Sequence, residues 1–325
     1  TNREVGKELQ KATECDFSIH SKQELGDFSK KDLERVWFFT QAENIEELEE
    51  LINKGLRKFV IDNEVDLERI LKAIEKRKVK IWLSLRMKFQ EHRVGSGKYF
   101  VYGMYSERIN ELILRIQKIN SEFIEKIGIH IHRKSQNTNE WEIKKEIEDS
   151  LRKEVLEKIS FLNFGGGLPV KYRSYTTNIL EYIFSKLKEA MDWLQDLGIE
   201  SYIEPGRFIA GPCIKLETEI IQIYDKNVVI NTTIYNCAID SVLTNTKMLV
   251  EQEVFEGDSE EKNKNTDNYL VKGNSPTRDD IFRYNVKLKK EKARVGEKIV
   301  FLNAGAYNYT TDFFGYVKIP TIVLD

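Results

Sequence analysis

The segment Ile159-Ser160-Phe161-Leu162-Asn163-Phe164-Gly165-Gly166-Gly167-Leu168-Pro169 decides the fold. Residues 159–164 are mostly apolar, and the run has the length of a buried strand. Three consecutive glycines then end it. Because glycine has no Cβ, successive backbone N–H groups in such a turn can point at one anion. An ordinary turn is the alternative, so this segment alone leaves both interpretations open.

Strand and helix patterns alternate on either side of this segment. The strands that we predict from short apolar runs are 15–19, 36–39, 59–62, 81–86, 127–132, 159–164 and 201–204. The helices that we predict from helical spacing are 23–28, 45–52, 66–74, 109–116, 143–151 and 179–197. Such alternation favours a parallel sheet covered by helices. Seven strands are one short of a (β/α)₈ barrel, so we expect a barrel of this type with its first strand upstream of Thr1. An open doubly wound sheet is the alternative.

The pattern changes after Gly211, where helical spacing gives way to short runs that suit strands. These runs are 214–224, 228–230, 269–271 and 299–302. The charged segment 251–268 predicts a mobile surface loop. We therefore expect a barrel domain over residues 1–212 and a C-terminal, mainly antiparallel β domain over residues 213–325.

Composition excludes several classes of function. The 51 basic and 53 acidic residues give a net charge of −2, which does not favour a nucleic-acid partner. Cys15, Cys213 and Cys237 are too widely spaced for a metal or disulfide pattern, which predicts a reducing, cytoplasmic location and no bound metal. The apolar runs are too short to cross a bilayer, so no membrane partner is expected.

The strand that follows the glycine run ends in Glu204-Pro205-Gly206-Arg207. In βα barrels the loops after the last two strands often form a phosphate site. The glycine amides and the Arg207 guanidinium would together supply donors to one phosphate. A surface ion pair is the alternative for Arg207, and a helix cap is the alternative for Glu204.

Four motifs in order resemble the ornithine/diaminopimelate/arginine decarboxylases, which are fold type III pyridoxal-phosphate enzymes. They are His130-Ile131-His132-Arg133-Lys134-Ser135-Gln136, Phe164–Pro169, Glu204–Arg207 and Gly305-Ala306-Tyr307. One of these motifs is weak evidence, but four in the family's order, over nearly the whole chain, are specific. The resemblance implies a TIM barrel, pyridoxal 5'-phosphate as cofactor and a lyase that decarboxylates an amino acid, as in polyamine or lysine biosynthesis.

The resemblance also assigns roles to individual positions. Glu204 matches the catalytic carboxylate that keeps the pyridine nitrogen protonated, so that the ring accepts electrons. His132 matches the imidazole that stacks on the ring, although a lone histidine at a strand end more often serves the fold. We expect His130 to serve packing and Arg86 to support the site from behind. The positions that match cofactor contacts, mainly to the phosphate, are Ser135, Gly165, Gly166, Gly167, Gly206, Arg207 and Tyr307.

In the predicted β domain, residues 273–280 resemble the family's Gly-x-x-Cys-x-x-x-Asp stretch. Asp280 matches a substrate-binding carboxylate, which suits an amino acid with a cationic or amine-bearing side chain. Asp279 competes for that role, and a plain turn carboxylate is the alternative. The family contributes this stretch to the partner subunit's site, so the resemblance implies a homodimer with shared active sites.

The chain departs from the family at three places. The Schiff-base lysine of a Lys-x-Asn motif is not in the chain, and since Thr1-Asn2 resembles the residues after it, we expect the lysine just upstream. Pro276 stands where the family has the cysteine that protonates Cα, which leaves Tyr307, Thr277 or water as donors. Lys134 replaces a glycine. Two alternatives to decarboxylation remain: a non-catalytic homologue that binds a partner, and a pyridoxal-phosphate racemase.

Overall fold

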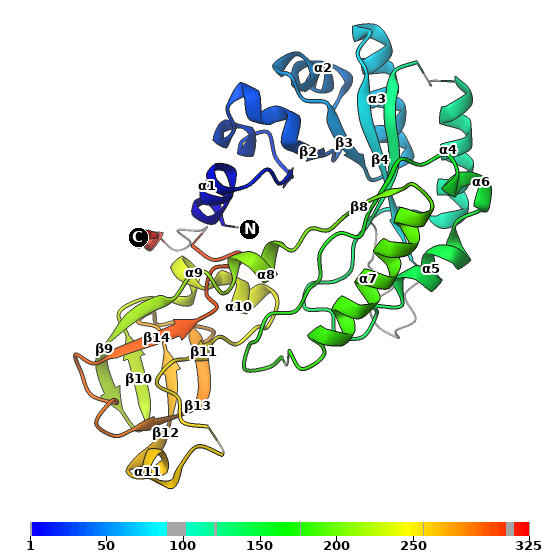
Figure 1. The fold of residues 1–325 in the computed structure, drawn as a ribbon. Helices are drawn as coiled ribbons and strands as arrows, with labels where there is room; N and C mark the ends of the chain where they lie inside the picture. Colours follow the sequence, from blue (N-terminus) through cyan, green and yellow to red (C-terminus); the bar gives the residue numbers. More distant parts are fainter. Residues whose placement is uncertain are drawn as a thin grey trace. The chain divides into compact units, whose positions relative to one another are not determined.

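The computed structural model describes residues 2–89, 102–119, 122–175, 177–255, 257–309 and 315–324. Thr1, which the sequence comparison places just after the lysine motif, lies outside these residues. The chain divides into two compact units (Figure 1). The α/β unit comprises residues 12–167 and 180–204, and the β unit comprises residues 1–11, 168–179 and 205–325. Short segments before the predicted boundary at 212 therefore make their contacts within the β unit.

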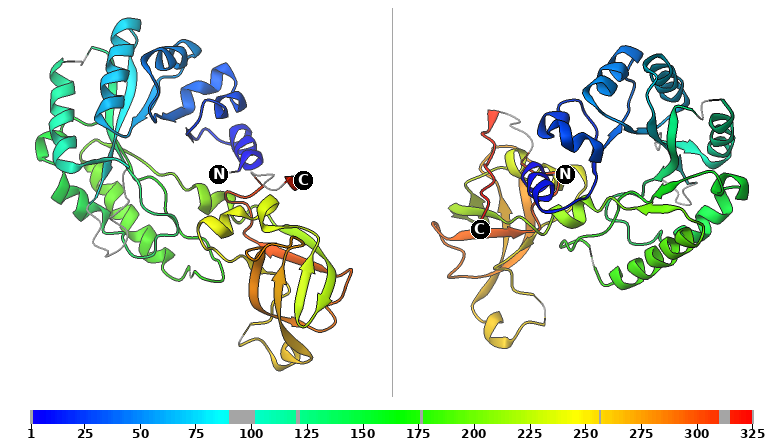
Figure 2. Two further views of the ribbon diagram at one scale, coloured as in Figure 1. Left: turned by 180° about the vertical axis from the view of Figure 1, so that it is seen from behind. Right: turned by 45° about the horizontal axis from the view of Figure 1, so that its top comes forward.

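A parallel sheet forms the α/β unit. The strands are β1 (Phe17–Ile19), β2 (Val36–Phe39), β3 (Lys58–Ile61), β4 (Ile81–Lys88), β5 (Met104–Tyr105), β6 (Ile124–Ile131), β7 (Phe161–Asn163) and β8 (Glu200–Tyr202). Their order is β1-β2-β3-β4-β6-β7-β8, β5 pairs with β4, and every pair is parallel. The sheet curves into a half-barrel (Figure 2). All seven strands that the sequence predicted are confirmed.

Helices cover the outer side of this half-barrel (Figures 1 and 2). They are α2 (Ile45–Lys54), α3 (Glu64–Arg77), α4 (Ser106–Ile119), α5 (Ile143–Ser150), α6 (Lys153–Leu156) and α7 (Leu180–Asp196). A capping box of Asn44 and Glu47 begins α2, and Gly55, with φ of 113°, ends it. The helix predicted at 23–28 forms as the 3₁₀ helix Glu24–Asp27, because the backbone bonds there connect residues three apart, and a second 3₁₀ helix, Lys30–Arg35, follows it.

The β unit is a mixed sheet. The strands are β9 (Leu216–Tyr224), β10 (Asn227–Ile230), β11 (Leu249–Val250), β12 (Thr266–Lys272), β13 (Ile281–Lys289) and β14 (Lys298–Leu302). Their order is β11-β14-β9-β10-β12-β13, and only β10 and β12 pair in parallel. The loop predicted at 251–268 is wrong in part. Ser259 caps the short helix α11 (Glu260–Asn263), and Thr266 to Tyr269 pair with β13.

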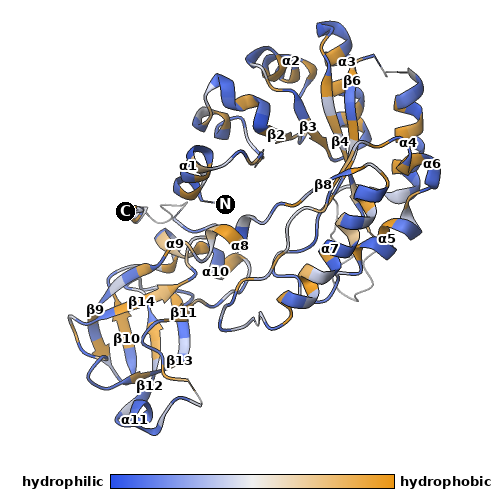
Figure 3. Ribbon diagram, viewed as in Figure 1, coloured by the Kyte–Doolittle hydropathy of each residue, from blue (hydrophilic) through white to orange (hydrophobic). Residues whose placement is uncertain are grey.

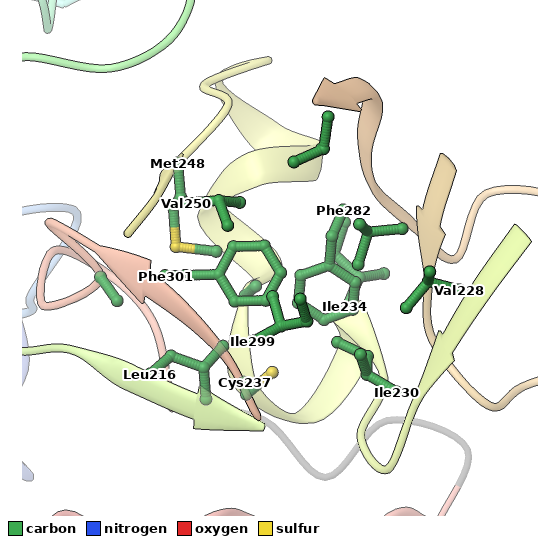
Figure 4. Packing of buried hydrophobic residues seen from close by; sticks show 14 of the residues in the cluster. Leu216, Val228, Ile230, Ile234, Cys237, Met248, Val250, Phe282, Ile299 and Phe301 are labelled. Atoms are coloured by element: carbon green, nitrogen blue, oxygen red, sulfur yellow. The ribbon is translucent and has the colours of Figure 1, made fainter. Parts of the chain in front are cut away.

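Apolar side chains from these strands fill the core of the β unit. Phe282 and Phe301 stack with ring centroids 5.0 Å apart, and Ile234 and Cys237 of the short helix α9 (Ile234–Cys237) pack beside them (Figure 4). The unit also contains α1 (Arg3–Ala12), α8 (Gly206–Ala210) and α10 (Ile239–Leu243). Apolar residues concentrate on the strands, whereas the helices carry polar residues as well (Figure 3). Among the described residues no helix has the length and apolar character that crossing a bilayer requires.

Candidate functional site

Polar side chains gather at the carboxyl ends of the parallel strands in the α/β unit. Ser18 lies on β1, His130 on β6 and His132 directly after β6, while Gly165 follows β7 and Glu204 follows β8. Parallel βα folds build their sites at this edge, because the carboxyl ends of all the strands meet there. Four of these five positions come from the motifs that the sequence singled out.

The carboxylate of Glu204 is the centre of this group. Its Oε1 accepts hydrogen bonds from Ser18 Oγ at 2.6 Å and from Asn163 Nδ2 at 3.2 Å. Its Oε2 lies 3.1 Å from His130 Nε2. Since β1 and β8 stand at the two ends of the sheet order, the bond from Ser18 joins the first strand to the last. Three strands therefore fix one carboxylate in position.

Glu204 is held in its ionised form. Burial alone would raise the pKa of this carboxyl, but the positive charge and hydrogen bond of His130, together with the hydrogen bond of Ser18, lower it to about 2. The side chain of Glu204 keeps 19% of its surface exposed, whereas that of His130 keeps 1%. His130 is buried and packs against Phe39, as expected, and its ring also lies within hydrogen-bond distance of the carboxylate.

His132 presents an exposed imidazole at the same edge. Its ring lies nearly parallel to that of His130, at 15°, with centroids 6.1 Å apart. Its Nδ1 accepts a long hydrogen bond, 3.3 Å, from the N–H of Gly166. Desolvation by the surrounding protein, followed by repulsion from a protonated His130, lowers the pKa of His132 below its ordinary value. Its imidazole is therefore neutral near pH 7 and can lie against a planar ring.

The glycine turn after β7 has no room for side chains. A Cβ at Gly165, whose φ is +67°, would lie 2.2 Å from the carbonyl oxygen of Ile131, and one at Gly166 would lie 2.9 Å from that of Glu204. The N–H of Gly165 donates to Asn163 Oδ1 at 2.8 Å, and that of Gly166 donates to His132. Among the described residues only Gly167 of the three has an N–H without a partner. Close packing thus explains the glycines, and their contact with a phosphate stays a prediction.

Arg207 belongs to the β unit, where it forms a buried ion pair. Its Nη1 and Nη2 donate to the Asp240 carboxylate at 2.5 and 2.8 Å, and Nη1 also lies 3.3 Å from Tyr172 Oη. The ring of Tyr307 lies 5.0 Å from the guanidinium carbon. Gly206 is the first residue of α8, one position before Arg207. The ion pair is thus buried, in contrast to the surface pair considered as the alternative, and the phosphate roles of these residues stay predictions.

Asp280, also in the β unit, has no exposed surface. Its two carboxylate oxygens accept hydrogen bonds from the backbone N–H groups of Ile234, at 2.8 Å, and Ser275, at 2.9 Å. Asp279 is exposed and lies 3.6 Å from Arg278. The contacts of Asp280 order the turn around Pro276. Its predicted substrate-binding role stays a prediction, and these contacts weigh against it.

The remaining predicted positions lie in loops of the α/β unit. Ser135 is exposed in the turn after β6. Lys134, which replaces a glycine of the family, has no positive φ, so its side chain causes no backbone strain there. Gln136, with φ of 59°, has the left-handed conformation instead. Arg86 pairs with Asp62 at 3.3 Å.

The sequence did not single out Ser18 or Asn163 as site residues. Both are polar residues within predicted apolar strands, Ser18 in 15–19 and Asn163 in 159–164. A polar side chain in such a run needs a partner when it faces the interior, and this is the signal that could have found them.

The family model described as "Pyridoxal-dependent decarboxylase, pyridoxal binding domain" matches residues 3–211. No curated protein sequence gives a match.

Solved structures resemble the chain over nearly its whole length. Diaminopimelate decarboxylase from Helicobacter pylori, complexed with L-lysine, has a TM-score of 0.77 at 20% identity, over 98% of this chain and 81% of that one. Lysine/ornithine decarboxylase from Vibrio vulnificus, complexed with cadaverine, has a TM-score of 0.75 at 19% identity, over 99% of this chain and 84% of that one. Lysine decarboxylase from Selenomonas ruminantium has a TM-score of 0.77 at 18% identity, over 99% of this chain and 83% of that one. At these identities the likeness shows the fold. The family match covers well over half of the chain, so the protein belongs to the pyridoxal-dependent decarboxylase family.

Proposed function

We propose that the protein binds pyridoxal 5'-phosphate and decarboxylates an amino acid that has a cationic or amine-bearing side chain. The observation that carries this proposal is the ionised carboxylate of Glu204, fixed by Ser18, Asn163 and His130 beside the exposed ring of His132. Membership of the family supports the cofactor and the class of reaction. The fold relatives complexed with L-lysine and cadaverine support the class of substrate.

The residues at this edge fit the cofactor. A fixed carboxylate with a pKa of about 2 suits a protonated pyridine nitrogen, because it remains charged near neutral pH. The glycine turn packs closely against the residue after β8 and against His132, because neither Gly165 nor Gly166 has a Cβ. His130 Nε2 lies 3.1 Å from Glu204 Oε2, and its buried Nδ1 has no hydrogen-bond partner among the described residues.

Three groups of this chain would perform separate tasks. When bound, the cofactor supplies an electron sink for the bond that breaks at Cα. Glu204 would hold the ring proton at the pyridine nitrogen, because its fixed carboxylate is an anion. His132 would orient the ring through its own neutral imidazole, and the free N–H of Gly167 would donate to the phosphate. We also propose that the enzyme works as a homodimer.

A binding and turnover experiment tests the proposal. Visible absorbance of bound pyridoxal phosphate is expected on titration, and CO₂ release is expected from lysine, ornithine or diaminopimelate. Loss of a charged hydrogen bond costs about 1.5–3 kcal/mol, so Glu204→Gln should weaken cofactor binding by roughly 10- to 100-fold. Glu200→Gln is the matched control, because that carboxylate lies on β8, the strand that Glu204 follows, but pairs with Lys126. A featureless titration, or equal affinities for both variants, would refute the proposal.

A second candidate rests on Pro276. The proline is exposed in the turn between Ser275 and Thr277, and it has no proton to deliver to Cα. A non-catalytic homologue that acts by binding a partner therefore remains the rival proposal, and a racemase is another. Cofactor binding without CO₂ release or loss of chirality from any of these amino acids would favour the first. Loss of chirality without CO₂ release would favour the second.

A further inference from the structure

We propose that His130, His132 and Glu204 also form a binding site for a divalent transition-metal ion, with Zn²⁺ as the expected occupant when no organic cofactor is bound. One ligand atom from each residue lies within 4.8 Å of the other two. The inference needs only these three side chains, so it stands whether or not the proposed function is correct.

The donor set selects the class of metal. Two imidazoles and one carboxylate are the protein ligands of a common type of zinc site that keeps a fourth position open. Imidazole nitrogen suits Zn²⁺, Cu²⁺, Ni²⁺ and Co²⁺, whereas Mg²⁺ and Ca²⁺ prefer oxygen ligands alone. The group should therefore bind late first-row ions and leave Mg²⁺ in solution.

The spacing requires little movement. Bonds of about 2.0–2.1 Å in a tetrahedral site place two ligand atoms roughly 3.4 Å apart. His130 Nε2 and Glu204 Oε2 are already 3.1 Å apart, close to that separation. His132 is the ligand that has to approach. Its ring is exposed, and among the described residues it accepts only the long hydrogen bond from Gly166, so rotation of this ring costs little.

The surroundings support the carboxylate as a ligand. Ser18 and Asn163 both donate to Oε1, so Oε2 is the oxygen left to face His130. Hydrogen bonds of this kind fix ligand carboxylates in metal sites, and their loss typically weakens metal binding 10- to 100-fold. Phe39, edge-on to His130 at 5.0 Å, restricts the imidazole further. The exposed side of His132 leaves room for water as a fourth ligand.

Metal and cofactor would require the same side chains. If Glu204 binds a metal ion, its carboxylate is no longer available to a protonated ring nitrogen. The metal ion and the cofactor should therefore compete. The apparent affinity for one should fall as the concentration of the other rises above the dissociation constant of that other ligand.

The experiment uses the full chain without cofactor, in a Cys15→Ser/Cys213→Ser background. This background is necessary because Cys15 and Cys213 are exposed thiols that would capture metal on their own. Co²⁺ titration should give one saturable visible spectrum of nitrogen and oxygen ligands, without sulfur-to-cobalt charge transfer. Calorimetry should give one Zn²⁺ per chain and no heat with Mg²⁺. His132→Gln should weaken binding at least tenfold, and Ser18→Ala about tenfold.

His20→Gln is the matched control. His20 lies at the end of β1 against Phe39, but it is not a member of the ligand group, so its replacement should leave the affinity unchanged. A spectrum that does not saturate, or one that His132→Gln leaves intact, would overturn the metal site. Added pyridoxal phosphate separates the two proposals: displacement of Co²⁺ supports both, whereas saturable Co²⁺ binding without displacement supports the metal site and rejects the proposed cofactor.

Discussion

Gly165 and Gly198 provide a matched pair for testing the close packing of the glycine turn. Both have positive φ, 67° and 73°, so replacement by alanine lowers the free energy of unfolding by about 1–2 kcal/mol at either position through backbone strain alone. At Gly198 a Cβ meets nothing within 4 Å. At Gly165 it would lie 2.2 Å from the Ile131 carbonyl oxygen, and since real contacts do not fall below 3.0 Å, the end of β6 has to retreat by about 0.8 Å. Overpacking of this kind adds about 1–3 kcal/mol.

Urea unfolding of the two variants measures the difference. We expect Gly165→Ala to lose about 2–5 kcal/mol of unfolding free energy and Gly198→Ala about 1–2 kcal/mol. Because the same Cβ would lie 3.0 Å from the His132 Cα, Gly165→Ala should also weaken cofactor binding, and Gly198→Ala should not. Equal losses of stability in the two variants would refute the packing that we describe for this turn.

Three further predictions follow from charged and buried groups. Glu253→Ala should cost about 3–5 kcal/mol in urea unfolding, because it leaves Arg283, held at 2.7 and 2.9 Å, buried without its partner; a loss below about 1 kcal/mol would contradict that burial. The pKa of Glu204 is about 2 in the folded protein and ordinarily 4.5, so its ionised form stabilises the fold fully above pH 4.5, and this contribution is lost as the pH falls from 4.5 to 2. The stability difference between the wild type and Glu204→Gln should therefore change across that window, and a constant difference would count against the assignment. Burial raises the pKa of the Cys237 thiol to about 12, so a thiol reagent should titrate two cysteines in the native protein and the third only after unfolding.

Replacements at two family positions have different structural consequences. Lys134 takes the place of a glycine without strain, because the left-handed residue of that turn is Gln136. Pro276 lies in a turn that is ordered by the two backbone bonds of Asp280. Lys134 therefore leaves its backbone unstrained, and the loss of a family thiol at Pro276 stays a prediction.

Much of the α/β unit was predictable because its signals are local. Seven strands and most of the helices follow from apolar periodicity, which depends on residues a few positions apart. The pattern at 23–28 predicted a helix without specifying its type, because 3₁₀ and α turns share similar short patterns. The loop prediction at 251–268 was wrong in part because Thr266 to Asn268 pair with β13, and that pairing depends on a segment further along the chain.

The sequence by itself determined the parallel sheet, the glycine turn and the order of the motifs at its carboxyl edge. Only the tertiary structure decided that Ser18, 186 residues away, would bond to Glu204, and that His130 would take part in the same group. It also decided that Arg207 pairs with Asp240 and that Asp280 bonds to the backbone around it. The physical reason is that periodicity specifies which face of an element is apolar. The contacts between polar groups depend on strand order and sheet curvature, which arise only when distant segments pack together.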